Sequence, residues 1–158
     1  MRLVQFNQHG QQCLGLELSE NGDLINLNKA DESIPRDMRT FLECGEDTWN
    51  KARSASNRKD CLVKRNCVKI LAPITSCEKV LCIGMNYTDH CKEQNADIPA
   101  EPVVFNKFPS CIIGPDDSLS YPEEAKLLDW EAELVIVIGK TAKHVKLENA
   151  IQYVFGFT

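Results

Sequence analysis

Three short runs of apolar residues open the chain and predict its first strands. We expect strands at Leu3 to Phe6, at Cys13 to Leu18 and at Leu24 to Leu27. Asn21-Gly22 separates the second run from the third, and this pair is a strong signal for a hairpin turn. The first part of the chain is therefore expected to be a small set of β-strands.

The apolar spacing then changes to that of helices. A helix that begins near Pro35 places Met38 and Phe41 on one apolar stripe, and Gly45 is expected to end it. A second, weakly amphipathic helix is predicted from Thr48 to Asn57. We find no chemistry in this strand-then-helix segment and expect it to have a structural role.

The pattern of apolar and polar residues changes between residues 60 and 75. The polar stretch from Ser56 to Arg65 has no clear period and is interpreted as a linker, and Val68 to Leu71 is a short extended segment. We therefore predict an α+β protein with an N-terminal subdomain over 1–72 and a second domain over 73–158.

Two apolar runs in the second domain predict buried strands. Lys79 to Ile83 ends at a Gly-Met-Asn break, and Leu134 to Ile138 is mostly β-branched and ends at Gly139. The second run is expected to be buried on both faces. A further short strand is predicted at Val103 to Phe105.

The last residues predict a brief helix at Leu147 to Tyr153 and then a new strand from Val154. The chain stops inside this apolar run at Thr158. A natural domain seldom ends in a half-made strand, so we expect the sequence to be part of a longer protein.

Composition narrows the classes of function. The 43% hydrophobic and 26% charged residues are ordinary for a globular protein, and a net charge of −5 without a basic stripe argues against nucleic-acid binding. No apolar run is long enough to span a bilayer, and the N-terminus lacks the pattern of a signal or transit peptide. We place the chain in the cytosol by default, with an organellar precursor that has lost its leader as the alternative.

The eight cysteines are expected to be free thiols, because they contain no Cys-x-x-Cys and no zinc-like spacing. Cys82 lies in an apolar run and is interpreted as a core residue. Cys91 follows His90 directly, but adjacent residues on a helix do not face each other, which argues against a nucleophilic Cys91.

Glu131 and Glu133 stand just before the second apolar run. Side chains alternate along a strand, so both point to one side, with Cα atoms about 7 Å apart. Two carboxylates placed in this way can converge on one divalent cation, which would offset their mutual repulsion. Taken alone, two solvated glutamates remain the commoner arrangement, since Glu is rarely buried.

His90 and Glu93 are three residues apart on a predicted helical turn that follows the first buried strand. This spacing puts them on one helix face, where a carboxylate can orient an imidazole that acts as a general base. On a polar helix such a pair is more often a surface ion pair of little value. Its position after a glycine-bearing loop at a strand end favours function.

These motifs together resemble the fumarylacetoacetate hydrolase family. The resemblance rests on Gly84-x-Asn-Tyr-x-x-His-x-x-Glu93, on Phe105-Asn106-Lys107, on the acidic strand from Leu128 to Gly139, and on Gly156-Phe157-Thr158. The N-terminal Met1 to Phe6 and the stretch His90 to Asn95 narrow it to one eukaryotic branch.

The resemblance implies a fold and a site. The second domain would be the first part of the family's mixed β-sheet roll. Glu131 and Glu133 would be two of three carboxylate ligands of Mg²⁺ (or Mn²⁺ or Ca²⁺), with the third after Thr158. His90 and Glu93 would form the catalytic dyad. Asn106 and Lys107 would lie on the substrate side, although a lysine between aromatic residues is more often a surface residue.

The implied activity is that of a metal-dependent enzyme on small 2-oxo or 2,4-dioxo acids. Such a substrate would chelate the metal and react through an enolate, by acylpyruvate-type C–C hydrolysis or by oxaloacetate tautomerisation or decarboxylation. The resemblance also implies a homodimer and allows a mitochondrial location. The alternative is a short product of the same family that binds a partner without catalysis; an unrelated structural domain would require the motifs to be coincidental.

Overall fold

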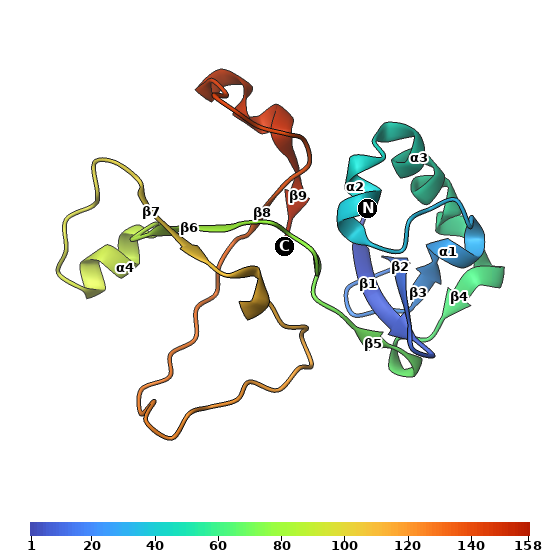
Figure 1. The fold of residues 1–158 in the computed structure, drawn as a ribbon, viewed down its shortest axis with the longest axis horizontal. Coiled ribbons are helices and arrows are strands. Elements are labelled where there is room, and N and C mark those ends of the chain that lie inside the picture. Colours follow the sequence, from blue (N-terminus) through green and yellow to red (C-terminus); the bar gives the residue numbers. More distant parts are fainter.

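The computed structural model describes residues 1–158 and contains an N-terminal sheet with helices, followed by two separate two-stranded ribbons (Figure 1). The N-terminal unit comprises β1 Leu3–Gln8, β2 Gln11–Glu17, β3 Leu24–Asn26, α1 Leu27–Ala30, α2 Met38–Glu43, α3 Glu46–Ser54, β4 Leu62–Val63 and β5 Lys69–Ile70. The ribbons comprise β6 Val80–Gly84, α4 Thr88–Glu93, β7 Val103–Lys107, β8 Ile136–Ile138 and β9 Val154–Phe157. Short 3-10 turns lie at Ala55–Asn57, Lys59–Cys61, Arg65–Cys67, Pro109–Cys111 and Leu147–Tyr153.

The N-terminal sheet is antiparallel, with strand order β4-β3-β2-β1-β5. Because side chains alternate along each strand, its two faces carry separate apolar clusters. One cluster joins Leu14 and Ile25 of the sheet to Phe41 of α2. The other is built around Phe6 and Ile70 on the opposite face. Most of the fully buried side chains of the chain lie in these two clusters.

Side chains at the helix starts satisfy backbone donors that a helix leaves free. The Asn26 side chain accepts a hydrogen bond from the Lys29 amide, and the Asp37 carboxylate accepts one from Thr40 at 2.9 Å. Asp37 also accepts from the Ser76 hydroxyl. Burial by itself would raise the pKa of Asp37, but these hydrogen bonds outweigh it and lower the pKa. The ionised Asp37 therefore caps α2 and ties it to the segment before β6.

A single buried carboxamide connects four parts of the N-terminal unit. Gln5 on β1 is fully buried. Its Nε2 donates to the Ala72 carbonyl at 2.9 Å, while its Oε1 accepts from the Met38 amide at 2.7 Å and from the Gln12 side chain at 3.0 Å. Gln5 therefore ties β1 to β2, to the start of α2 and to the chain that leaves β5.

Both ribbons are antiparallel pairs of strands. In the first, Val80 of β6 stands opposite Lys107 of β7 and Gly84 opposite Val103. In the second, Ile136 of β8 pairs with Phe157 of β9, and a bulge interrupts the ladder after Val137. Residues 112–135, between β7 and β8, contain no helix or strand.

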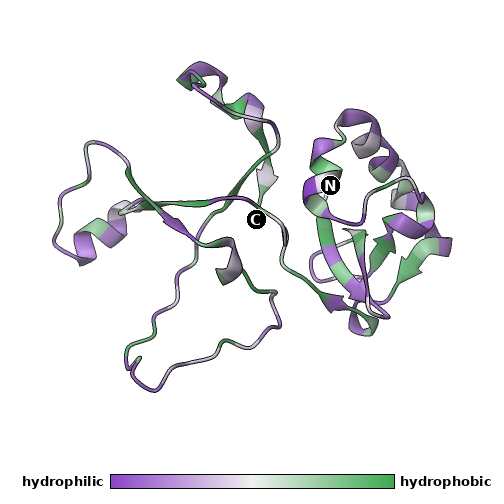
Figure 2. Cartoon of the chain, viewed as in Figure 1, coloured by the Kyte–Doolittle hydropathy of each residue, from purple (hydrophilic) through white to green (hydrophobic).

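Both ribbons contain hydrophobic residues (Figure 2). Many of their side chains are exposed. Leu81 of β6 is 66% exposed and Ile136 of β8 is 53% exposed. Burial of the two predicted strands, Lys79 to Ile83 and Leu134 to Ile138, is therefore wrong for this chain. Each ribbon has only two strands, and no second layer covers its outer faces, so a sequence typical of a buried strand stays exposed. Cys82, predicted in the core, is likewise only half-buried.

Several element boundaries also differ from expectation. The helix predicted from Thr48 to Asn57 is α3, Glu46–Ser54, followed by a 3-10 turn. The predicted linker Ser56 to Arg65 contains β4, which pairs with β3 and completes the sheet edge. Leu27, expected at the end of the third strand, begins α1 instead, because the Asn26 cap turns the chain. The apolar run at Leu134 becomes a strand only from Ile136. The α+β class is confirmed, whereas the division at residues 72 and 73 stays a prediction.

The structure also describes the cysteines and the lengths of the helices. All eight cysteines are free, as predicted. The structure contains no helix with the length and hydropathy needed to cross a bilayer.

Replacing Gln5 by leucine should destabilise the N-terminal unit. The Met38 amide and the Ala72 carbonyl would lose their buried partner, and each buried group left unpaired costs about 1–3 kcal/mol. We expect the free energy of unfolding in urea to fall by about 3 kcal/mol. The matched change Gln11→Leu, at an exposed position of the neighbouring strand, should stay within about 0.5 kcal/mol of wild type. Equal effects of the two changes would contradict the role assigned to Gln5.

Candidate active site at the Asn86–Glu133 contact

The loop that leaves β6 presents the first polar groups of the site. β6 ends at Gly84, and Met85 follows with φ of 52°, in the left-handed region that bulky residues seldom occupy. This backbone conformation turns the chain sharply before Asn86 and Tyr87. A strained residue directly after a strand is typical of functional loops that aim side chains.

Asn86 and Tyr87 contact the segment that carries the two predicted metal ligands. The Asn86 amide donates from Nδ2 to Oε2 of Glu133 at 3.1 Å. The Tyr87 hydroxyl accepts a hydrogen bond from the Leu134 amide at 3.4 Å. The structure therefore brings together two motifs that lie 47 residues apart in the sequence.

Glu131 and Glu133 lie before β8, in a segment without helix or strand. Both side chains are exposed, and neither forms an ion pair with a lysine or arginine. Two carboxylates without a cationic partner suit a hard divalent cation in donor type and in charge. No three side chains of His, Cys, Asp or Glu converge on one point, so this chain offers an open, two-carboxylate arrangement.

Helix α4 begins directly after Tyr87 and carries His90 and Glu93. The predicted helix is present, so the two residues share one face as expected. Both side chains are exposed, and no hydrogen bond or ion pair joins them; the ion pair on this helix links Lys92 to Asp89 at 3.0 Å. Their catalytic role stays a prediction.

Cys91 occupies the opposite, inner side of the same helix. Its side chain is 1% exposed, and its Sγ donates to the Met85 carbonyl at 3.5 Å. This contact anchors α4 to the strained loop. A thiol packed in this way is typical of a core residue, as the sequence indicated.

Asn106 and Lys107 lie at the other end of the first ribbon. Lys107 stands opposite Val80, four residues before Gly84, which is about 13 Å along the strand. Its ammonium group sits 5.6 Å from the centre of the Phe105 ring, in a cation–π contact. The structure does not bring these two residues to the Asn86 loop, and their substrate role stays a prediction.

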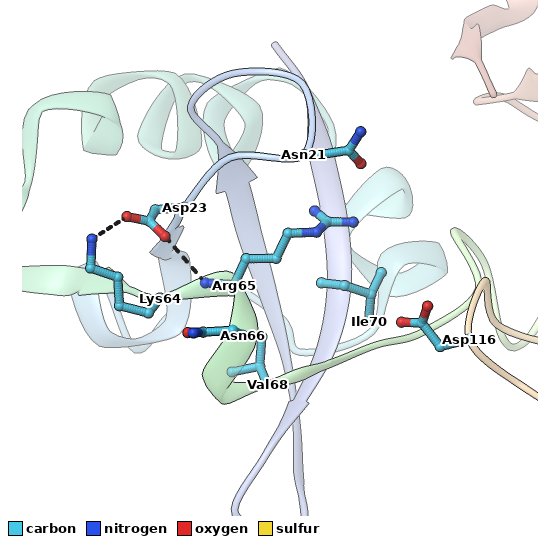
Figure 3. Close-up of a pocket in the computed structure, with 8 residues that line it drawn as sticks. All are labelled: Asn21, Asp23, Lys64, Arg65, Asn66, Val68, Ile70 and Asp116. Carbon is cyan, nitrogen blue, oxygen red and sulfur yellow. Dashed lines mark hydrogen bonds and ion pairs between the residues drawn. The ribbon is translucent and has the colours of Figure 1, made fainter.

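A cavity with a volume of about 510 Å³ lies elsewhere, against the N-terminal sheet. In this cavity the Lys64 ammonium and the Arg65 amide both donate to Asp23 (Figure 3). The hydrogen bond from Lys64 is the main reason that the pKa of Asp23 is lowered. The guanidinium of Arg65 is bound to Glu17 at 2.8 Å. We find no group in this cavity that is poised for chemistry.

Sequence reasoning did not assign roles to Asn86 and Tyr87. Both belong to the Gly-x-Asn-Tyr motif, so their place in a functional loop was visible. Their contacts to Glu133 and Leu134 were not, because residue spacing does not tell which distant loop a side chain meets.

Comparison with known proteins identifies the family of the chain. Residues 79–158 match the profile described as fumarylacetoacetate (FAA) hydrolase C-terminal. The chain therefore belongs to the fumarylacetoacetate hydrolase family. The matched region contains both ribbons, the Asn86 loop, α4 and the two glutamates.

The relatives point to one branch of that family. The chain is 49% identical to the oxaloacetate tautomerase fahd2, mitochondrial, of Xenopus laevis and 48% identical to the human oxaloacetate tautomerase FAHD2A, mitochondrial, each over 160 residues. It is 44% identical over 154 residues to a Dictyostelium discoideum homolog of fumarylacetoacetate hydrolase domain-containing protein 2. These matches cover 94–100% of the chain. The chain spans about half the length of these curated relatives, with 49–51% of each covered.

Solved structures give the same class of fold. A fumarylacetoacetate hydrolase from Exiguobacterium antarcticum matches with a TM-score of 0.75 and 29% identity, covering 99% of this chain and 53% of that chain. A 2-hydroxyhepta-2,4-diene-1,7-dioate isomerase from Mycobacterium marinum matches with a TM-score of 0.67 and 26% identity, covering 99% and 52%.

The burial of Cys91 predicts its reactivity. In the folded protein we expect alkylation of Cys91 by iodoacetamide to be much slower than alkylation of the exposed Cys44, Cys67 and Cys111. Mass spectrometry of tryptic peptides after timed labelling measures each rate. Modification of Cys91 as fast as the exposed thiols, without unfolding, would contradict its placement against Met85.

Proposed function

We propose that the full-length protein containing this chain is an enzyme that acts on small 2-oxo acids, with keto–enol tautomerisation of oxaloacetate as its main reaction. The observation that carries the proposal is the hydrogen bond between Asn86 and Glu133. It joins the loop that leads into His90 to Glu133, one of the two carboxylates without cationic partners. The names of the relatives support the choice of oxaloacetate.

In this proposal Glu131 and Glu133 hold Mg²⁺, or Mn²⁺ or Ca²⁺ in its place. When bound, the cation would supply Lewis-acid polarisation of the 2-oxo carbonyl. Asn86 holds one Glu133 oxygen by donating from Nδ2, which restricts the carboxylate to one orientation. Such support of a ligand by a neighbouring group commonly changes metal affinity by about 10- to 100-fold.

His90 moves the proton. In the keto-to-enol direction the imidazole accepts a proton from C3, next to the carbonyl. The imidazolium then gives a proton to the carbonyl oxygen and returns to its neutral form, so that one C–H bond breaks and one O–H bond forms. Glu93, one helical turn away, orients the imidazole and stabilises its protonated form. Water is neither consumed nor released, which separates tautomerisation from C–C hydrolysis.

Hydrolysis of an acylpyruvate, or decarboxylation of oxaloacetate, would use the same groups. The deciding experiment assays the full-length protein against enol and keto oxaloacetate and against acylpyruvates, each with and without Mg²⁺. Rapid Mg²⁺-dependent loss of the enol absorbance, without pyruvate formation or C–C cleavage, supports the proposal. Cleavage of acylpyruvates at a higher kcat/KM than tautomerisation would refute the choice of reaction.

We propose further that the full-length protein works as a homodimer in mitochondria, without nucleic-acid or membrane partners. The location rests on the names of the relatives. The exposed apolar faces of both ribbons favour association with further polypeptide, and the same faces keep open the alternative of a non-catalytic binding partner.

Removal of either proposed metal ligand tests the cation site. In the full-length protein, Glu131→Ala or Glu133→Ala should abolish Mg²⁺-dependent turnover, because the loss of one carboxylate leaves too few oxygen ligands to hold a hard divalent cation. Glu123→Ala, a change to an exposed carboxylate in the segment without helix or strand, should leave turnover unchanged. Isothermal titration with Mn²⁺ provides the parallel measurement of binding. Full activity of both variants without added metal would refute the assignment.

His90 should affect chemistry without affecting metal binding. We expect His90→Ala to lower kcat by about 10²–10⁴, the usual contribution of an acid–base group, while the Mn²⁺ dissociation constant stays unchanged. His144→Ala, at an exposed histidine outside the site, is the matched control. Loss of Mn²⁺ binding in His90→Ala would show that His90 is a ligand.

A further inference from the structure

An aromatic contact joins the N-terminal unit to the ribbon that follows Glu133. The rings of Trp49 on α3 and Phe155 on β9 have centroids 5.0 Å apart and an interplanar angle of 69°, an edge-to-face arrangement. Phe155 and Val137, one from each strand of the ribbon, both pack against the main N-terminal core. The segment that had no assigned chemistry therefore contacts the ribbon next to the site.

A hydrogen bond within the N-terminal unit fixes the indole ring of Trp49. Its indole Nε1 donates to the Phe41 carbonyl at 3.1 Å, in the last turn of α2 where carbonyls lack helical partners. Phe41 itself is fully buried in the core. The indole is thus fixed in position by both helices and cannot follow a moving ribbon without breaking this hydrogen bond.

Phe155 is aimed at Trp49 by the bulge in β9. Val137 pairs with Gly156 and Ile138 pairs with Val154, so Phe155 is the extra residue without a partner. Bulges turn a side chain out of the regular alternation and are common near active sites. Gly139 is matched to this geometry, since a Cβ at its position would lie 2.8 Å from the Phe155 Cβ.

Backbone hydrogen bonds link the strands of the ribbon between the Phe155 contact and the segment that carries the carboxylates. The Gly139 amide donates to the Tyr153 carbonyl at 2.8 Å, and the amides and carbonyls of Val135 and Thr158 bond to each other at 2.9 and 3.0 Å. Glu133 lies two residues before Val135 and is bound to Asn86. The ribbon is therefore attached at two points: Phe155 contacts Trp49, and Glu133 is bound to Asn86.

We propose that Trp49 is a positioning residue: through Phe155 it fixes the β8–β9 ribbon, and with it the carboxylates of Glu131 and Glu133, relative to the Asn86 loop. The identity of the cation rests on the proposed function. The contact between Trp49 and Phe155 is independent of it. The N-terminal unit thereby controls the geometry of the cation site in the second domain.

The test uses the full-length protein with Trp49→Ala, the conservative Trp49→Phe, and Gly139→Ala, which disturbs the contact from the ribbon side. Phe6→Leu is the matched control, because Phe6 lies in the other apolar cluster, which does not include the ribbon. Amide hydrogen exchange is followed at Val135 and Gly139, and Mn²⁺ affinity is measured by electron paramagnetic resonance.

We expect faster exchange at both amides in Trp49→Ala and Gly139→Ala, by about 2- to 13-fold from loss of the aromatic pair alone. Mn²⁺ affinity should fall by about tenfold. Trp49→Phe should restore both values substantially, and Phe6→Leu should change neither. Phe155→Ala combined with Trp49→Ala should add little to either single change.

Two results would overturn the proposal. One is unchanged exchange at Val135 and Gly139 in folded Trp49→Ala. The other is faster exchange there while Mn²⁺ binds as in wild type. A wild-type protein that binds no Mn²⁺ would instead refute the proposed function, and the exchange measurements would still decide whether Trp49 holds the ribbon.

Discussion

The buried carboxamide of Gln5 is the interaction on which the arrangement of this chain depends. Its three short hydrogen bonds connect β1 to β2, to the start of α2 and to the chain leaving β5. A buried amide is tolerated only when its donors and acceptors are paired, so each of these parts must stay in place for the others to do so. The N-terminal unit is consequently rigid at the points where the second domain attaches.

Both arms of the second domain depend on that rigidity. The chain into β6 is held by Asp37 through Ser76 and by Arg39 through Glu78. The β8–β9 ribbon contacts the next helix, α3, through Phe155 and Trp49. The hydrogen bond from Asn86 to Glu133 then links the loop after β6 directly to the segment before β8, at the candidate active site. A segment without chemistry of its own can therefore set the distance between the groups that have it.

The N-terminal unit and the two ribbons differ in how fully they bury their apolar residues. The N-terminal unit places apolar clusters on both faces of its sheet, while Leu81, Val104 and Ile136 of the ribbons remain exposed. Exposed apolar strands with open edges have a strong tendency to pair with further polypeptide. The ribbons therefore offer apolar surface to further polypeptide.

Local patterns in the sequence predicted most elements correctly, because turn signals and apolar periods act over a few residues. The Asn21-Gly22 turn, the stripe of Met38 and Phe41, and the short helix after Tyr87 are examples. The motifs around His90 and Glu133 also sufficed to indicate the family, now confirmed. The sequence could not show that a polar linker would complete a sheet edge at β4, nor that apolar strands would lie open, because burial depends on which other elements are present to cover them.

The sequence by itself determined the kinds of groups available: two carboxylates two residues apart, an imidazole near a third carboxylate, and a glycine-bearing loop before a helix. Only the tertiary structure decided which of them meet. It placed Asn86 on Glu133, left Lys107 at the far end of its ribbon, and joined Trp49 to Phe155. The physical reason is that contacts between distant segments depend on strand register, on a bulge and on the packing of whole elements, and none of these is encoded by the spacing of the residues that finally touch.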